Sequence, residues 1–377
     1  MSLAPLSQIP SDIVAVDDYI PYAKERMSAQ AWAYFSGGVA NEHLLPENQR
    51  SWHQYRVLPR ILNDFKEANT RFSILGKEYE FPIFLAPIAY QKMAHFDGEL
   101  ASALAAAAMQ TPFIISMQST TPLSVLCEKA PGSKWLQWYW QTDKTASQSL
   151  LKEALHLGIE AIVLTVDAPV NGIRNREQRA GFAVPDGIKA ELLSDFVIQA
   201  QTVGGAGESP LFGSGFLANV PTWEMVADFI DDCPLPVILK GILNPLDAEK
   251  AIEVGAAAIV VSNHGGRVLD ILPPTAQVLG GVCEVVAGRI PVLVDGGIRR
   301  GSDVFVALAL GATAVLVGRP YLYAMAAAGA SGVAHVLHLL RAELEVTMAL
   351  TGCRTIEEIK GVKLGKQKRL GRGAMPS

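Results

Sequence analysis

The segment Ala256-Ala-Ala-Ile-Val-Val-Ser-Asn-His-Gly-Gly-Arg267 contains both parts of the pattern that organises this chain. Its first half is a continuous apolar run, which is typical of a strand buried on both faces of a parallel sheet. Its second half places a histidine beside two glycines and an arginine, where the strand ends. We therefore expect a base, room for a ligand and an anion-binding cation together at the end of one buried strand.

Seven more apolar runs of this kind occur in the 377 residues. Helical patterns such as Glu99–Met109, Thr145–Leu157 and Asp303–Leu310 lie between them. Strands that alternate with helices form βα units, so eight units predict an α/β fold, a closed (β/α)8 TIM barrel. The expected strands are Phe81–Ile88, Pro112–Met117, Trp135–Trp140, Ala161–Val166, Leu235–Lys240, Ala256–Ser262, Ile290–Asp295 and Thr313–Gly318.

Three segments fall outside this repeat, within a chain that we interpret as one domain with its barrel over residues 81–350. Residues 1–80 form an N-terminal segment with a helical pattern near Pro21–Phe35. The connection from Arg174 to Pro221, with the glycine-rich Val203–Gly207, is long enough to be an active-site lid or disordered. Residues 366–377 are basic and are expected to be a mobile tail.

The composition excludes several classes of protein. The chain is 50% hydrophobic and has a net charge of −5, whereas nucleic-acid binding would require a clustered basic face. The sequence contains neither a secretory signal pattern nor an apolar run of about 18 residues for a membrane span. The four cysteines, Cys127, Cys233, Cys283 and Cys353, lack metal-ligand spacing and are expected to be reduced thiols. We expect a cytoplasmic protein without a metal, membrane or nucleic-acid partner.

Polar side chains follow the first four strands, where chemistry is located in barrels. Small residues in Ala86–Ala89 would let a flat ligand lie against the backbone, although an ordinary turn is the alternative. Polar groups that point inward from apolar strands need partners, either one another or a polar ligand. Because four successive strands carry them, we favour a ligand. These groups are Ser116, Gln137, Tyr139, Thr165 and Asp167.

The fifth and sixth strands end in Lys240 and His264. Lys240 either extends to solvent or faces negative charge in the barrel mouth, and we favour the second. A lone histidine is more often structural, but His264 follows a buried strand and has Asp167 at a nearby strand end. A carboxylate beside an imidazole orients it and stabilises its protonated form, as a general base requires.

The last two strands lead into Asp295-Gly-Gly-Ile-Arg-Arg-Gly301 and Gly318-Arg319-Pro320. Barrels often bind phosphate with these two loops. Glycines expose backbone N–H groups, and Arg299 or Arg319 adds a charge-assisted contact. Another pair, Arg174 and Arg267, indicates a substrate carboxylate, whereas Arg176 and Arg179 are interpreted as surface or lid charges.

Ser262–Asp270 closely resembles the active-site signature Ser-Asn-His-Gly-Gly/Ala-Arg-Gln-Leu-Asp of the FMN-dependent α-hydroxy acid oxidases and dehydrogenases. Val268 departs from it where glutamine is usual. The resemblance covers residues 15–360 in order and implies FMN-dependent oxidation of an (S)-2-hydroxy acid to the 2-oxo acid. It includes Ala86–Ala89, Gln91–His95, Leu164–Asp167, Lys240-Gly241, Asp295–Gly301 and Gly318–Pro320.

The same resemblance implies roles for individual residues. His264 is the base and Asp167 its partner, while Lys240 lies near the flavin edge that gains charge on reduction. The implied substrate-binding residues are Tyr34, Tyr139, Arg174, His264 and Arg267. The implied cofactor-binding residues are Ala86, Pro87, Ile88, Ala89, Ser116, Gln137, Thr165, Lys240, Ser262, Asp295, Gly296, Gly297, Arg299, Gly318 and Arg319. Whether the α-hydrogen leaves as a proton or as a hydride stays open.

The subfamily follows from two local resemblances. Gln118 occupies the place where plant-type glycolate oxidases have a tryptophan, and Val170–Arg176 is similar to the bacterial lactate oxidases. We therefore expect a lactate-oxidase-like enzyme that passes electrons to oxygen and forms hydrogen peroxide, with glycolate and mandelate as alternative substrates. A dehydrogenase that uses a quinone or another acceptor is the close alternative. The resemblance also implies a homo-oligomer, with tetramers common.

The sequence disfavours two other classes of protein. An isomerase or aldolase could use Lys240 as a Schiff-base nucleophile, but His264, Asp167 and the arginine pair would then have no role. A non-catalytic flavin-binding barrel is disfavoured because the whole catalytic set is present.

Overall fold

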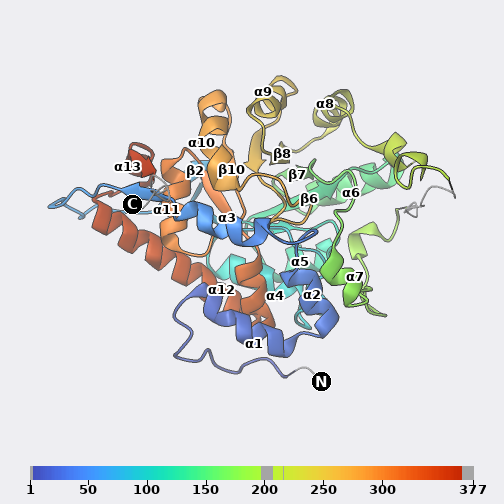
Figure 1. The fold of residues 1–377 in the computed structure, drawn as a ribbon, viewed down its shortest axis with the longest axis horizontal. Helices are drawn as coiled ribbons and strands as arrows, with labels where there is room; N and C mark the ends of the chain where they lie inside the picture. The colour runs from blue at the N-terminus through green and yellow to red at the C-terminus, as the bar shows by residue number, and fades with distance from the viewer. Residues whose placement is uncertain (1–2, 197–206, 215, 367–377) are drawn as a thin grey trace, which may run out of the picture.

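The computed structural model describes residues 3–196, 207–214 and 216–366. Its eight central strands are parallel and form a closed barrel in the order β10, β11, β4, β5, β6, β7, β8, β9, with helices around it (Figure 1). The predicted (β/α)8 barrel is thus confirmed, and each strand overlaps its predicted run. The strands are β4 (Ile83–Leu85), β5 (Phe113–Ile115), β6 (Lys134–Tyr139), β7 (Ile162–Thr165), β8 (Val237–Ile242), β9 (Ala258–Val261), β10 (Val292–Val294) and β11 (Ala314–Val317).

The strands are apolar because they are buried on both faces. Every residue of β5, β7, β9 and β11 is buried, as the continuous apolar runs predict. At the strand ends, the register pairs Tyr139 with Thr165 and Thr165 with Lys240. Polar side chains from β6, β7 and β8 are therefore neighbours at one mouth of the barrel.

The end of β8 departs from regular pairing. Its register with β9 shifts between Lys240 and Ile242, and Gly241 between them has φ +118°. A Cβ at Gly241 would lie 2.5 Å from the Cβ of Asp167. Only glycine permits both this conformation and this approach, so Gly241 lets Asp167 lie directly against β8.

Helices with capped N-termini form the outer layer. Asp143, Thr222 and Asn244 each accept a hydrogen bond from a backbone N–H in the first turn of α6, α8 and α9, which stabilises a helix start. The predicted helices at 99–109, 145–157 and 303–310 are confirmed as α4, α6 and α11. The layer comprises α4 (Glu99–Ala108), α5 (Leu123–Lys129), α6 (Lys144–His156), α8 (Trp223–Asp232), α9 (Pro245–Glu253), α10 (Thr275–Val286), α11 (Gly301–Ala309) and α12 (Arg319–Thr351).

The long helix α12 is part of the protein core. By length and composition it could cross a membrane, but 61% of its most apolar window is buried. It packs against α1 (Tyr19–Arg26), α4 and α11, which lie beside it in Figure 1. Its helical geometry is interrupted at Ala328 and Gly329, so its two parts run at an angle to each other.

The N-terminal segment combines helices with short strands. Helices α1 (Tyr19–Arg26) and α2 (Ala29–Ser36) cover the predicted helical stretch, and α3 (Leu44–Trp52) follows. The helical pattern did not predict the hairpin of β2 (Phe72–Ile74) and β3 (Lys77–Tyr79). The aromatic rings of this hairpin pack on Phe84 of β4, so it is anchored to the barrel.

Secondary structure occurs in the described residues of both segments that were predicted to be a lid or a tail. The connection after β7 contains α7 (Asn175–Arg179) and short 3-10 turns, while 203–206 of its glycine-rich run lie outside the described residues. The predicted tail began one residue too early, because Lys366 belongs to β12 (Leu364–Lys366), which pairs with β1 (Tyr55–Val57). Residues 367–377 lie outside the described residues. The short helix α13 (Ile356–Lys360) precedes β12.

Candidate active site

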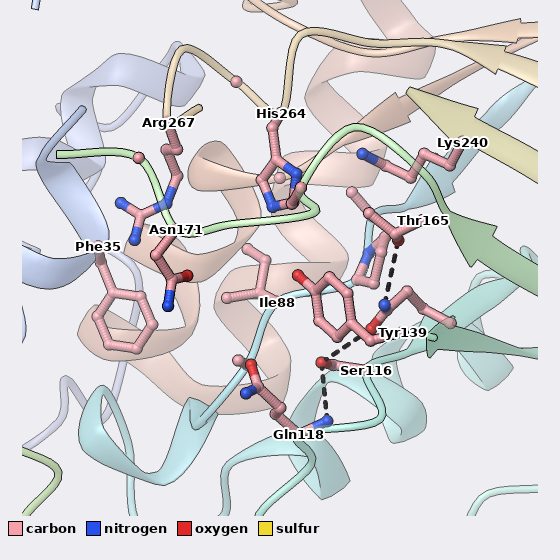
Figure 2. Close-up of a pocket in the computed structure, with 18 of the residues that line it drawn as sticks. Phe35, Ile88, Ser116, Gln118, Tyr139, Thr165, Asn171, Lys240, His264 and Arg267 are labelled. Carbon is pink, nitrogen blue, oxygen red and sulfur yellow. Dashed lines mark hydrogen bonds between the residues drawn. The ribbon is translucent and has the colours of Figure 1, made fainter. Parts of the chain in front are cut away.

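A large cavity occupies the mouth of the barrel where the strands end. Its volume is about 1480 Å³, whereas single-ligand pockets usually enclose roughly 300–1,000 Å³. The strand ends, the N-terminal segment and the connection after β7 all contribute to its wall (Figure 2). The cavity therefore has room for a cofactor with a small substrate beside it.

The structure brings nearly all of the predicted site residues into this cavity. Asp167 and Ser262 do not reach its wall and lie behind it, against His264 and Lys240. The residues on the wall are Tyr34, Ala86, Pro87, Ile88, Ala89, Ser116, Gln137, Tyr139, Thr165, Arg174, Lys240, His264, Arg267, Asp295, Gly296, Gly297, Arg299, Gly318 and Arg319.

His264 and Asp167 form a directed pair. Nδ1 of His264 lies 2.9 Å from Oδ1 of Asp167, so Nε2 is the ring nitrogen left for other partners. Burial alone would raise the pKa of Asp167, but the adjacent His264 and then Lys240 lower it below its usual value. Asp167 is therefore ionised and can stabilise an imidazolium on His264.

The backbone at His264 is in an uncommon conformation. His264, Gly265 and Gly266 have φ values of +55°, +61° and +75°, and non-glycine residues are uncommon in the left-handed region, although histidine adopts it more often than most. The backbone N–H of His264 donates to Oγ of Ser262 at 3.1 Å. Such strain is found where the surrounding structure holds a functional residue in place.

Lys240 is a buried cation with two partners. Its Nζ donates to Oγ of Ser262 at 2.9 Å and lies 3.0 Å from Oδ2 of Asp295. Burial would lower the pKa of Lys240, but Asp295 and Asp167 raise it. The prediction that it faces negative charge is confirmed, and the alternative of an extension to solvent is wrong because only 5% of Lys240 is exposed.

A chain of hydrogen bonds runs along one wall through Ser116, Gln137 and Thr165, and dashed lines mark it between Ser116 and Thr165 in Figure 2. Oγ of Ser116 donates to Oε1 of Gln137 at 3.3 Å, and Nε2 of Gln137 donates to Oγ1 of Thr165 at 3.1 Å. These polar groups therefore satisfy one another, as the alternative interpretation expected, and they also border the cavity, so their contact with a ligand stays a prediction. Their mutual bonds fix the side chains that a flavin ring would meet.

Arg299 and Arg319, which are predicted to bind the phosphate of the cofactor, donate hydrogen bonds to backbone carbonyl oxygens. Arg319 donates to the carbonyl oxygens of Phe35, Gly37 and Gly265, and burial lowers the pKa of Arg319 to about 10. A guanidinium has five N–H donors, so two of those on Arg319 are left for a ligand. Nε of Arg299 lies 3.0 Å from Oδ1 of Asp17, a pairing that the sequence did not predict.

The arginine pair lies beside two tyrosines. The guanidinium of Arg267 lies 4.9 Å from the ring centre of Tyr34, and Tyr34 stacks on Phe182. Burial raises the pKa of both Tyr34 and Tyr139, so both hydroxyl groups keep their protons. This part of the cavity wall therefore offers two cations and two neutral hydroxyl donors.

Among the wall residues that the sequence did not predict, Glu177 and Phe182 contact predicted site residues. Glu177 contacts both Arg174 and Arg267, and its position three residues after Arg174 in a helical stretch could have indicated the first contact. No local motif indicated Phe182. Arg176 and Arg179 are exposed, as predicted, and Arg176 pairs with Glu42.

The residues at the cavity suit FMN. Lys240 supplies a buried positive charge beside the hydrogen-bonded wall, where a flavin ring could lie flat. Oδ1 of Asp295 is buried and has no hydrogen-bond partner among the described residues, so it can accept from a ribityl hydroxyl. Arg299 and the free donors of Arg319 match a phosphate.

Comparison with known proteins gives the same assignment. The FMN-dependent dehydrogenase family matches residues 23–365. An L-lactate oxidase from Roseobacter sp. (strain GAI101) is 44% identical over 92% of this chain and 93% of its own length. Glycolate oxidase 3 from Arabidopsis thaliana is 39% identical, with coverages of 92% and 95%. A crystal structure of mandelate oxidase with benzoyl-formic acid superimposes with a TM-score of 0.85, at 38% identity and coverages of 94% and 98%. This chain therefore belongs to the FMN-dependent dehydrogenase family, and its cofactor is FMN.

Proposed function

We propose that this protein oxidises an (S)-2-hydroxy acid to the 2-oxo acid and passes the electrons to oxygen, forming hydrogen peroxide. The observation that carries the proposal is the convergence of the His264–Asp167 pair and the arginine pair on one cavity. A base and a carboxylate clamp in one site fit a substrate that carries a hydroxyl next to a carboxylate. FMN, when bound, accepts the two electrons.

Each side chain has a task in this reaction. Arg174 and Arg267 bind the substrate carboxylate, and the neutral hydroxyls of Tyr34 and Tyr139 hold the substrate in position. His264 takes a proton at Nε2, because Asp167 occupies Nδ1. Asp167 stabilises the resulting imidazolium, and the buried charge of Lys240 is already in place to offset negative charge on the cofactor side.

Lactate is the substrate that we favour. Two relatives named L-lactate oxidase, from Roseobacter and Nostoc, are 44% and 41% identical to this chain. Glycolate and mandelate are the alternatives, since glycolate oxidases and mandelate oxidase are also similar. An amide side chain, Gln118, borders the cavity beside Ser116 (Figure 2), where it limits the apolar surface available to an aromatic substituent.

A Schiff-base enzyme is not supported. A lysine nucleophile must lose its proton near neutral pH, whereas Asp295 and Asp167 raise the pKa of Lys240. This argument favours an electrostatic task for Lys240 over a covalent one.

Anaerobic spectroscopy tests the proposal. The purified protein should show a flavin spectrum that S-lactate bleaches faster than glycolate or S-mandelate does. Readmission of air should restore the colour and release peroxide. Bleaching without peroxide formation, together with rapid dye or quinone reduction, would make the enzyme a dehydrogenase. A yellow protein that none of these acids bleaches would overturn the proposed substrate class.

We also propose a cytoplasmic homotetramer, on the basis of family resemblance. Light scattering of the holoenzyme after gel filtration tests the assembly, and a monomer mass would contradict it.

A further inference from the structure

A buried carboxylate lies between the two arginines of the proposed carboxylate clamp. Oε1 of Glu177 is 2.9 Å from Nη2 of Arg267, and Oε2 is 3.6 Å from Nη1 of Arg174. Glu177 is only 8% exposed, and it lines the same cavity as both arginines. The clamp is therefore a group of three charges with one net positive charge.

Glu177 is not needed merely to hold Arg267. Nη1 of Arg267 already donates to the carbonyl oxygens of Tyr34 and Gly37, and its guanidinium lies over the Tyr34 ring. These contacts fix the position of the arginine without a carboxylate. What Glu177 adds is negative charge beside two cations that repel each other in a partly buried site.

We infer that Glu177 is a specificity-determining residue, which sets the clamp to accept a 2-hydroxy monocarboxylate with an uncharged side chain. One substrate carboxylate neutralises the net charge of the three groups. A second carboxylate on the substrate would find no uncompensated cation in the clamp and would be repelled by Glu177. This inference rests on the proposed function and adds the charge class of the substrate to it.

The first test compares two acids that differ by one carboxylate. The ratio of kcat/KM for S-malate to that for S-lactate is measured for the wild-type holoenzyme, Glu177→Gln and Glu177→Asp. Glu177→Gln should raise this ratio roughly tenfold, because repulsion of the second carboxylate is removed. Glu177→Asp keeps the charge, so it should lower both kcat/KM values and leave their ratio unchanged.

Glu249→Gln is the matched control. Glu249 forms an exposed pair with Arg289, and neither residue lines the cavity. Its neutralisation changes the net charge of the protein by the same amount as Glu177→Gln. The control should keep the wild-type ratio. A ratio that stays constant in Glu177→Gln, or that rises equally in Glu249→Gln, overturns the inference. A purely structural role would lower both kcat/KM values together.

A second measurement requires no variant. Propionate and succinate, as inhibitors of charge −1 and −2, are titrated against the wild-type flavin spectrum at increasing NaCl. Similar salt dependence for the two is expected, whereas a much steeper dependence for succinate would show an uncompensated second cation and overturn the inference. Wild-type flavin that no 2-hydroxy acid reduces would reject the proposed function, and the inhibitor titration would still report the charge of the clamp.

Discussion

Two groups of charged residues at the cavity are held in different ways. The strand-end group, Asp167, Lys240 and His264, lies at the ends of the neighbouring strands β7, β8 and β9, and its members pair locally. The arginine group, Arg267 and Arg319, donates instead to carbonyl oxygens of residues 34–37 in the N-terminal segment. The register of the barrel strands fixes the positions of the strand-end group. Contacts with the N-terminal segment, which is far away in the sequence, fix the positions of the arginine group. We infer that the first group governs the chemical step and the second governs binding.

The largest effect is expected for His264→Ala. Removal of the base should slow flavin reduction by about 10⁴-fold, while FMN stays bound because other residues form most of the cavity wall. Stopped-flow absorbance with S-lactate under anaerobic conditions measures the rate, and the protein-bound flavin spectrum is the control. Reduction at the wild-type rate would remove His264 from the chemical step.

The second-largest effect on catalysis is expected for Asp167→Asn. The amide cannot stabilise an imidazolium as a carboxylate does, so kcat should fall by about 10²- to 10³-fold with little change in KM. Steady-state kinetics with S-lactate separates the two constants. An effect confined to KM would place Asp167 with the binding residues and break the proposed division between the two groups.

Arg267→Lys should mainly change KM, whereas Asp167→Asn should mainly change kcat. Lysine cannot reproduce both carbonyl contacts and a planar contact with a carboxylate, so KM should rise by about 10- to 100-fold while kcat changes less. Dissociation constants of propionate, measured from flavin difference spectra, should rise in parallel. A loss of kcat at constant KM would contradict a binding role for this arginine.

Arg319→Lys should weaken FMN binding by about tenfold. The shorter, non-planar cation loses contacts to the residue 35–37 backbone and offers a phosphate fewer donors. Fluorescence of FMN released on dilution measures the affinity, with riboflavin as a control that lacks the phosphate. Equal weakening for FMN and riboflavin would assign Arg319 to bracing the backbone alone.

The smallest effect concerns stability at acid pH. The pKa of Asp167 is lower in the folded protein than in the unfolded chain. The pairing of Asp167 with His264 therefore stabilises the fold fully at pH values above the pKa of the unfolded state. This stabilisation is lost as the pH falls through the pKa of the folded state. Asp167→Asn should therefore flatten the decline of Tm between about pH 5 and pH 3. The change is small because Asp167 is one of 37 acidic residues. Differential scanning calorimetry across this range would detect it, and an unchanged slope would contradict the pairing.

The sequence predicted the strand-end group better than its surroundings. Continuous apolar runs locate buried strands, and a barrel brings the residues after them together, so Lys240 and His264 could be placed without a structure. The contact between Glu177 and Arg267 and the hydrogen bond from Arg319 to Phe35 could not, because each joins segments that no local pattern connects. The hairpin at 72–79 was missed for another reason, since its strands are three residues long and carry too few alternations to be recognised.

The hydrogen bond from Arg319 to Phe35 also has a consequence for the synthesis of the protein. Phe35 precedes Arg319 by 284 residues, and chains emerge from the ribosome at about 5–20 residues per second. The wall that both residues share cannot be completed until the last barrel strand and the start of α12 have been made. A nascent chain with seven strands therefore contains the proposed base His264 but an incomplete cofactor site, so FMN is expected to bind only after nearly the whole barrel has been synthesised.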